Sequence, residues 1–218
     1  MTLAQRGRWI TGIGFVLLAG IYVRALAFTP VELHQGPAQK IYYLHVPAAW
    51  SAMLAMGLVG LASILFLLVR DPRYDRFAAA SAEVGTVFSC VMLTTGPLWA
   101  KPVWGTWWTW DARLTLSLML FFLFIGYQLL RSVVASPALR ARYAAVLGIC
   151  GLVLLPFIHL SVYLFRTLHP QPIILKPSAP SAPPEMVLTL LASFAVFTLL
   201  YVGFVTQRYA MGGADRAA

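Results

Sequence analysis

Tryptophans crowd into one short stretch of this chain. The stretch "WGTWWTWDAR" occupies residues 104–113 and separates two long apolar runs. It contains four of the chain's seven tryptophans: Trp104, Trp107, Trp108 and Trp110. Each aromatic side chain can bury about 150–250 Å², and the i, i+3, i+4 spacing would put the first three on one face of a helix. The stretch therefore predicts a flat apolar surface with N–H donors at its edge.

Histidine supplies the metal-binding nitrogens that lie near this surface. His45 begins the second apolar run, His159 lies late in the fifth run and His169 follows it, while His34 belongs to the first connecting loop. A flat ligand that carries a metal suits such a combination. Haem has that shape, and histidine is a usual axial ligand of its iron. Nearby cations suited to haem propionates are Lys101, Arg113 and Arg166.

Two other interpretations of the tryptophans stay open at this point. Tryptophan anchors helix ends in the headgroup layer of a membrane, as an aromatic belt. A belt needs one or two such residues per helix end, whereas this stretch has four, with Trp99 close by. A quinone would also fit an aromatic surface, but it would not call for paired histidines.

The composition is that of a membrane protein. Hydrophobic residues make up 60% of the 218 positions and charged residues 11%, with a mean hydropathy of +0.79, whereas soluble domains have about 25% charged residues. The net charge of +9 comes from dispersed residues, which favours a topological role over nucleic-acid binding. Cys90 and Cys150 lie inside apolar runs without metal-binding spacing.

Six apolar segments are long enough to cross a bilayer, which takes roughly 20 residues in a helix. In hydrocarbon their backbone groups must be satisfied internally, so each segment predicts a helix. We expect an all-α integral membrane protein with a single domain over residues 1–218 and a Trp-rich connecting loop at 97–113 between the third and fourth helices. The expected spans are 9–28, 46–69, 77–96, 114–130, 143–165 and 186–206.

The first apolar segment also has features of a signal peptide. Arg6 and Arg8 precede it, and Ala25 and Ala27 form an A-x-A pattern near its end. However, the run is longer than a signal core of about 7–15 residues, and Arg24 lies beside the would-be cleavage site. We therefore expect a retained span.

Loop charges predict the orientation, because Lys and Arg are enriched in short cytoplasmic loops. One side carries ten of them: Arg6, Arg8, Arg70, Arg73, Arg76, Arg131, Arg140, Arg142, Arg208 and Arg216. The other side carries six: Arg24, Lys40, Lys101, Arg113, Arg166 and Lys176. Both termini are therefore expected in the cytoplasm, and the histidines and the Trp-rich stretch on or near the outer side.

Three segments resemble those of a known family. "LWAKPVWGTWWTWDARLT", residues 98–115, is similar to the WWD motif of the haem-handling proteins of cytochrome c maturation. "YYLHVPAAW" (42–50) and "LFRTLHP" (164–170) resemble the two histidine segments that flank this motif. The order and length of the six spans most resemble the haem exporter protein C (CcmC) family.

This resemblance implies that haem b is bound on the periplasmic side of the bacterial inner membrane, with His45 and His169 as axial ligands. It also implies presentation of haem for covalent loading onto the haem chaperone CcmE, with the ABC subunits CcmA and CcmB and the small subunit CcmD as partners, next to membrane lipid. The candidate haem-binding residues are His45, His169, Trp104, Trp107, Trp108, Trp110, Asp111, Arg113 and Lys101. We expect no enzyme activity, because no nucleophile, acid–base pair or phosphate loop is visible.

Several side chains have competing roles. Asp111 directly precedes the fourth span, where it can N-cap the helix and brace the loop without touching haem. Arg113 could pair with Asp111 or with a propionate. His159 is a rival ligand or an intramembrane histidine, and His34 is expected to be solvated. Glu83 is costly in lipid unless it is paired, so we expect an arginine of the cytoplasmic rim as its partner.

Two other functions remain in view. A haem- or quinone-binding electron-transfer subunit would hold a permanent redox centre, usually ligated within the bundle, and His159 would then matter more than His169. A small-solute transporter would often show an internal repeat and a pair of broken helices, and we find no repeat here.

Overall fold

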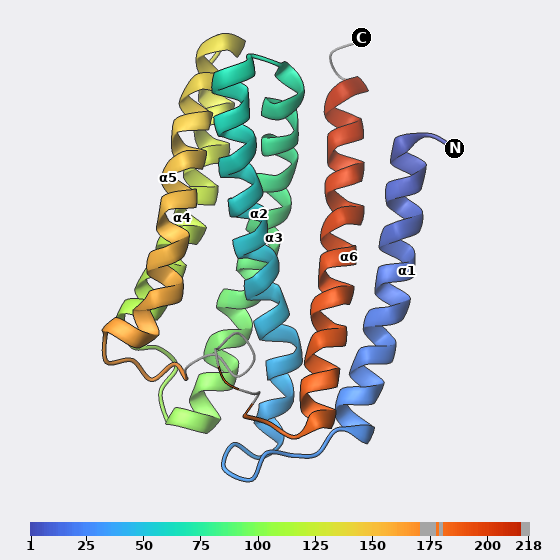
Figure 1. Cartoon of the computed structure of the whole chain (residues 1–218), viewed down its shortest axis with the longest axis vertical. Helices are drawn as coiled ribbons and strands as arrows, with labels where there is room; N and C mark the ends of the chain where they lie inside the picture. The colour runs from blue at the N-terminus through green and yellow to red at the C-terminus, as the bar shows by residue number, and fades with distance from the viewer. Residues whose placement is uncertain (171–177, 179–180, 215–218) are drawn as a thin grey trace.

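Six long helices form a bundle in the computed structural model, which describes residues 1–170, 178 and 181–214 (Figure 1). Each of the six is long and apolar enough to cross a membrane. The prediction of an all-α integral membrane protein is confirmed. A π-helical turn, Arg24–Phe28, extends α1, and a 3-10 turn, Pro37–Ile41, leads into α2. The helices are α1 Leu3–Val23, α2 Tyr42–Val69, α3 Pro72–Trp104, α4 Ala112–Val133, α5 Pro137–Leu164 and α6 Pro184–Ala214.

Local chemistry explains where several helices begin. Asp71 caps α3 by accepting a hydrogen bond from the Arg73 N–H at 2.8 Å, and Ser136 caps α5. A proline follows each cap, and its fixed φ suits the first helical position. α2 ends at Arg70 with a φ of 61°, which turns the chain directly into α3.

The third helix extends further than the sequence predicts. It continues to Trp104, so the expected loop at 97–113 is irregular only from Gly105 onward. Pro97 and Pro102 lie inside the helix, where each removes one backbone donor without ending it; membrane helices tolerate this when neighbouring groups satisfy the backbone. Gly105, at a φ of 76°, ends α3. Trp107 and Trp108 lie beyond the helix, so the helical face predicted for three tryptophans does not form.

Small residues let the central helices approach closely. A Cβ atom added to Gly60 of α2 would lie 2.4 Å from Leu152 Cβ of α5, and one on Gly148 would lie 2.4 Å from Ser63 Oγ. Close backbone approach of this kind is typical of membrane helix interfaces. α2 thus packs against both α3 and α5, while α6 holds α1 at the edge of the bundle (Figure 1).

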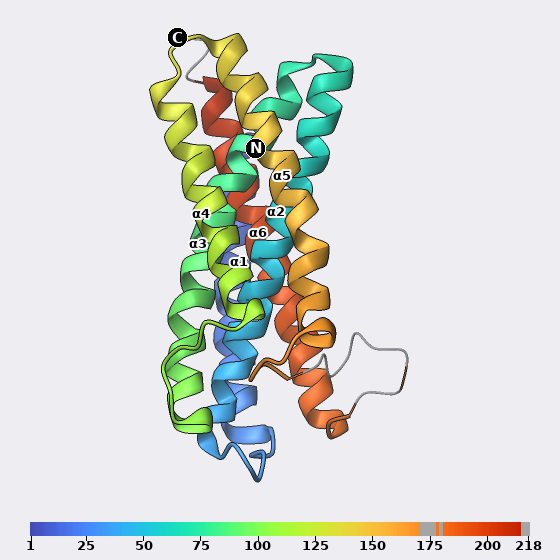
Figure 2. The ribbon, with the colours of Figure 1, turned by 90° about the vertical axis from the view of Figure 1, so that its left-hand side faces the viewer.

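The two ends of the bundle differ in content. Both described chain ends lie at one end, here called the terminal end, together with the α2–α3 and α4–α5 turns (Figures 1 and 2). The loops 29–41, 105–111 and 165–170 lie at the other, here called the pocket end. This places both termini on one side, as predicted; Lys176 and Arg216 lie outside the described residues. Glu83 pairs with Arg208 of α6, which confirms the expected arginine partner.

Candidate ligand-binding pocket

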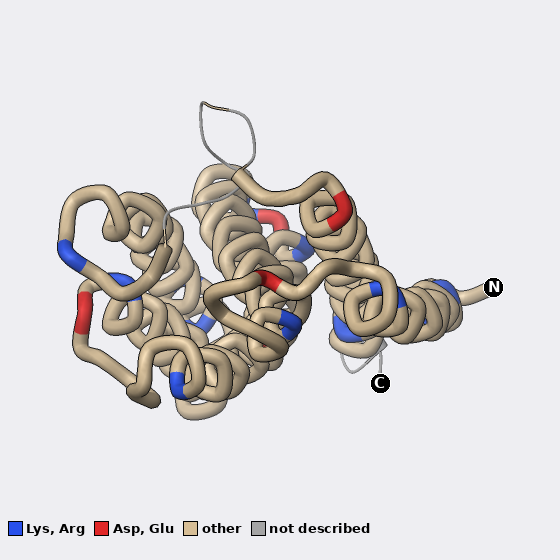
Figure 3. The backbone as a smooth tube through the Cα atoms, turned by 90° about the horizontal axis from the view of Figure 1, so that it is seen from below, with Lys and Arg blue, Asp and Glu red and all other residues tan. Residues whose placement is uncertain are grey.

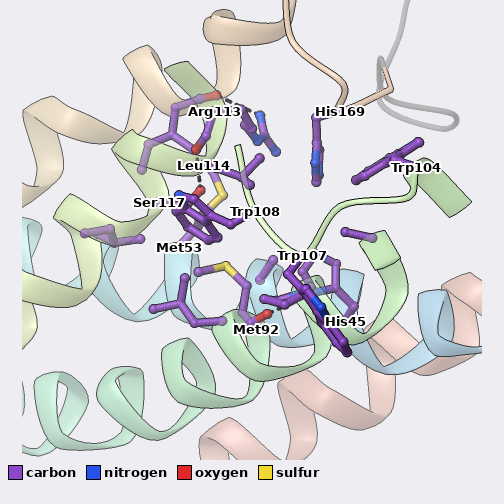
Figure 4. Close-up of a pocket in the computed structure, with 17 residues that line it drawn as sticks. His45, Met53, Met92, Trp104, Trp107, Trp108, Arg113, Leu114, Ser117 and His169 are labelled. Carbon is purple, nitrogen blue, oxygen red and sulfur yellow. Dashed lines mark hydrogen bonds between the residues drawn. The ribbon is translucent and has the colours of Figure 1, made fainter. Parts of the chain in front are cut away.

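A pocket opens at the pocket end, between α2, α3, α4 and α5 (Figure 4). Ligand sites are mostly apolar with a few placed polar groups. Here the apolar lining includes Met53, Met92 and Leu120. The polar and aromatic lining includes six of the predicted residues: His45, His169, Trp104, Trp107, Trp108 and Arg113.

His45 is held rigidly in the first turns of α2. Its side chain is buried, with 6% exposed. Nδ1 lies 3.1 Å from the Met92 carbonyl oxygen and 3.1 Å from Thr95 Oγ1, both on α3. Because the Thr95 hydroxyl donates to the Val91 carbonyl at 2.7 Å, both neighbours of Nδ1 can act as acceptors. Nδ1 therefore carries the proton, and Nε2 keeps the lone pair that a metal needs.

Two further residues of α3 shape the place of the His45 ring. A Cβ atom on Gly96 would lie 3.1 Å from His45 Cε1, so only glycine lets the imidazole sit this close without a shift. Trp99 is buried, stands edge-on to the same ring at 5.7 Å between centroids, and donates through Nε1 to Gln35. Gly96 and Thr95 could not be predicted as functional residues from the sequence, because small and hydroxyl residues are common in an apolar helix.

His169 reaches the pocket from the irregular segment after α5. Its ring centroid lies 6.3 Å from that of His45 and 6.0 Å from that of Trp104. Its Nδ1 is buried and finds no hydrogen-bond partner among the described residues. Burial lowers the pKa of the imidazole to about 3, and the positive charge of Arg113 acts in the same direction. The ring is therefore neutral at physiological pH and retains a lone pair.

Asp111 lies behind the pocket and does not line it. It caps α4 by accepting from the Leu114 N–H at 3.0 Å, which confirms the capping role considered from the sequence. The carboxylate also accepts hydrogen bonds from the Thr109 hydroxyl, the Thr167 hydroxyl and the Leu168 N–H. Burial acts to raise the pKa of Asp111, but these hydrogen bonds together lower it below its usual range. Asp111 thus joins the Trp-rich loop to the segment that carries His169.

The tryptophans divide between the cavity and the surface. Trp104 and Trp108 line the pocket, and the indole Nε1 of Trp108 is buried with no partner in the part of the chain that the structure describes. Trp107 lines the pocket with 53% of its side chain exposed. Trp110 is 76% exposed, lies outside the lining, and packs edge-on against Trp108 at 5.8 Å. Trp110 therefore supports the wall instead of forming it.

Two of the predicted cations, Arg113 and Lys101, lie on different sides of the pocket boundary: one lines the pocket and the other does not. Arg113 lines the pocket on the same side as His169 (Figure 4), and its Nη1 donates to the Ile158 carbonyl at 2.7 Å. No ion pair joins it to a carboxylate among the described residues. Lys101 is exposed outside the lining; it donates to the Gly105 carbonyl and lies 6.0 Å from the Trp107 ring centroid. Seen from the pocket end, basic residues are spread around the bundle (Figure 3).

The remaining histidines lie away from the cavity. His159 of α5 is half-buried against Tyr163, with 6.2 Å between ring centroids, and it does not belong to the pocket lining. His34 is exposed, and its backbone N–H donates to Glu32. The structure therefore brings together the two histidines of the flanking segments and separates both of the others from them.

The arrangement suits a flat ligand that brings its own metal. Two imidazoles that share a metal ion, each at a metal–nitrogen distance of about 2 Å, have ring centroids roughly 6 Å apart, which agrees with the 6.3 Å between His45 and His169. No group of three or more His, Cys, Asp or Glu that could hold a bare ion occurs among the described residues. Two nitrogen ligands fit the axial positions of an iron porphyrin. The unpartnered Trp108 Nε1 and His169 Nδ1 are polar atoms that such a ligand could satisfy.

Fold and site together define a polytopic helical membrane protein with a paired-histidine, tryptophan-walled pocket at one end. Comparison with known proteins narrows this class. The family described as Heme exporter protein C (CcmC) matches residues 1–216. Heme exporter protein C of Bradyrhizobium diazoefficiens is 40% identical over 195 residues, which cover 89% of this chain and 73% of the relative. The Haemophilus influenzae protein of the same name is 38% identical over 196 residues, which cover 90% and 80%.

A ccmC-like mitochondrial protein of cytochrome c biosynthesis from Marchantia polymorpha is 35% identical over 186 residues, which cover 85% of this chain and 78% of the relative. The chain belongs to the Heme exporter protein C family. Membership of this family supports a role in haem handling for cytochrome c maturation, and the chain is a multi-pass membrane protein.

Proposed function

We propose that this protein binds haem b at the pocket end and presents it for covalent loading onto the haem chaperone CcmE. The observation that carries the proposal is the pairing of His45 and His169, 6.3 Å apart, beside the wall formed by Trp104, Trp107 and Trp108. When bound, haem supplies the iron and the vinyl group that undergoes attachment. The protein holds haem in the position in which the chaperone can react with it.

Each part of the pocket has a role in this proposal. His45 and His169 are the axial ligands, and the tryptophans offer aromatic faces to the porphyrin. Arg113 lacks a described carboxylate partner and lines the cavity, so it is the cation best placed for a propionate. Trp107, which is half exposed, lies at the open side of the wall, where a partner could approach the haem edge. Lys101, Trp110 and Asp111 act on the loop from outside the cavity.

The proposed setting is the bacterial inner membrane, with the pocket end toward the periplasm and both termini in the cytoplasm. The charge distribution supports this orientation, because the loops and chain ends of the terminal end carry more Lys and Arg. We further propose that the chain works in a complex with CcmA, CcmB and CcmD, in which a partner subunit, not this chain, supplies ATP hydrolysis. No nucleic-acid partner is part of this function.

The axial assignment is tested with the purified full-length protein, loaded with haem, by visible spectroscopy. We expect a bis-imidazole spectrum in the wild type that is lost in both His45→Ala and His169→Ala. His34→Ala is the matched control, because His34 is exposed and does not belong to the pocket lining. An unchanged spectrum in both ligand variants would refute the assignment.

Haem exchange separates delivery from permanent electron transfer. A delivery protein should yield its haem to added haem-free CcmE, whereas an electron-transfer subunit should retain it in fixed stoichiometry. The position of His159 outside the pocket lining argues against a centre ligated deeper in the bundle. Haem that stays bound through incubation with the chaperone would favour the electron-transfer function instead.

A further inference from the structure

The two histidines are held in different ways. His45 lies in a helix, and two groups of α3 fix its ring through Nδ1. His169 lies in a segment without regular secondary structure, and its Nδ1 makes no hydrogen bond within the described chain. The position of the His169 ring therefore depends on how the backbone around it is anchored.

That backbone is anchored to Asp111. The His169 N–H donates to Thr167 Oγ1 at 3.1 Å, and the Thr167 hydroxyl in turn donates to the Asp111 carboxylate. The Leu168 N–H donates to the same carboxylate. Since Asp111 also caps α4, its side chain ties the His169 segment to the start of a membrane helix. We call this set of contacts, made by Asp111, Thr167 and Leu168, the Asp111 clip.

Capping alone does not account for these contacts. Asp71 caps α3 in the same way, but its side-chain partners are the backbone and guanidinium of Arg73, two residues away. Asp111 reaches more than fifty residues along the chain, to the segment beside His169. A half-buried carboxylate whose acceptor positions are filled from two segments holds both of them in place, because removing it would leave their donors without partners.

We propose that Asp111 is a positioning residue that sets whether His169 reaches the haem iron, while His45 binds iron independently of it. The inference rests on the proposed function. It makes His169 the exchangeable ligand and His45 the fixed one, so that haem leaves from the His169 side when the chaperone takes it. Asp111 itself is not among the residues that line the pocket.

The test uses full-length protein loaded with haem and compares Thr167→Val, Asp111→Asn and the capping control Asp71→Asn. Thr167→Val removes the relay to His169 and leaves the α4 cap intact, so it remains informative if the Asp111 variant folds poorly. We expect both clip variants to keep haem on His45 but to shift toward a five-coordinate, high-spin spectrum. Added imidazole should restore the low-spin spectrum, and Asp71→Asn should resemble the wild type.

Haem transfer to apomyoglobin gives a second readout. Release should be roughly tenfold faster in the clip variants, the factor expected for loss of one hydrogen bond to a charged group. Wild-type spectra and release rates in both variants would overturn the inference. Failure of the proposed function looks different: the wild type would then lack the bis-imidazole spectrum, or both histidine variants would leave it unchanged.

Discussion

The two ends of the bundle handle polar groups in opposite ways. At the terminal end the described carboxylates of α3 meet arginines: Asp75 pairs with Arg131 of α4, and Glu83 with Arg208 of α6. At the pocket end Asp111 accepts hydrogen bonds from N–H and hydroxyl groups, and Arg113 donates to a carbonyl. None of the ion pairs among the described residues lies at the pocket end.

Unpartnered atoms sharpen this difference. His169 Nδ1 and Trp108 Nε1 are buried at the cavity without a described partner. At the terminal end Arg76 also has a buried, unpartnered Nε, but its guanidinium stacks 4.1 Å from the Tyr209 centroid and donates to that hydroxyl at 2.6 Å. The terminal end thus pairs its charged groups with partners from the chain itself. The pocket end instead leaves buried polar atoms without described partners beside the pocket, where a ligand can bond to them.

The largest effect, on stability, should come from breaking the Asp75–Arg131 ion pair at the terminal end. Asp75→Asn leaves Arg131, whose side chain is only 16% exposed, without its carboxylate, and breaking a buried ion pair in this way typically costs about 3–5 kcal/mol of stability. Thermal unfolding in detergent measures this loss. The haem spectrum of the surviving folded protein should not change, because the pair lies far from the pocket. The exposed Arg73–Asp71 pair is the control, and Asp71→Asn should unfold close to the wild-type temperature. A spectral change in Asp75→Asn would show that the two ends are coupled.

The second-largest effect, on haem affinity, should come from removing a group that supports His45, the fixed ligand. Thr95→Val removes one of the two acceptors at His45 Nδ1 and loosens the ring that the helix holds. Loss of such a supporting group typically lowers metal affinity by about 10–100-fold, and the Met92 carbonyl that remains favours the lower end of that range. Haem titration measures the change. Thr206→Val is matched to it, since Thr206 makes a similar bond to its own helix far from the pocket. Equal affinity in both variants would mean that Thr95 does not support His45.

A smaller effect should follow from removing the unpartnered indole donor. Trp108→Phe keeps an aromatic wall but deletes Nε1, and a neutral hydrogen bond contributes about 0.5–1.5 kcal/mol. We therefore expect haem affinity to fall by several fold and the apoprotein to keep its stability, because no described hydrogen bond is lost. An apoprotein that unfolds earlier than the wild type would show that the indole has a structural partner.

The smallest effect is expected outside the cavity wall. Lys101→Ala should change haem affinity by less than about twofold. Its ammonium group is exposed outside the pocket, where it lies over the Trp107 ring and donates a hydrogen bond to the Gly105 carbonyl. Arg113→Met, at a cation that lines the pocket, is the informative comparison and should weaken haem binding clearly more. The reverse order would move the proposed propionate contact from Arg113 to Lys101.

Properties that depend on neighbours in the chain were predictable. Apolar runs of sufficient length predict the six spans, since a bilayer demands internally bonded helices whatever their packing. The Asp111 cap follows from a carboxylate placed directly before an apolar run, and the need of Glu83 for an arginine follows from the cost of an unpaired charge in lipid. The pairing of histidines from two segments was expected from motif resemblance, which carries information on tertiary proximity that spacing does not.

By itself the sequence determined the helical membrane class, the residue types available for binding and the local caps, because these depend on hydropathy and on contacts within a few residues. Tertiary structure alone decided that Trp110 and Lys101 lie outside the cavity, that α3 continues through two prolines, and that Gly96 and Thr95 shape the place of His45. Each of these outcomes depends on which face of a helix meets its neighbour. An apolar run buried in lipid or protein has no polar face to reveal that choice in advance.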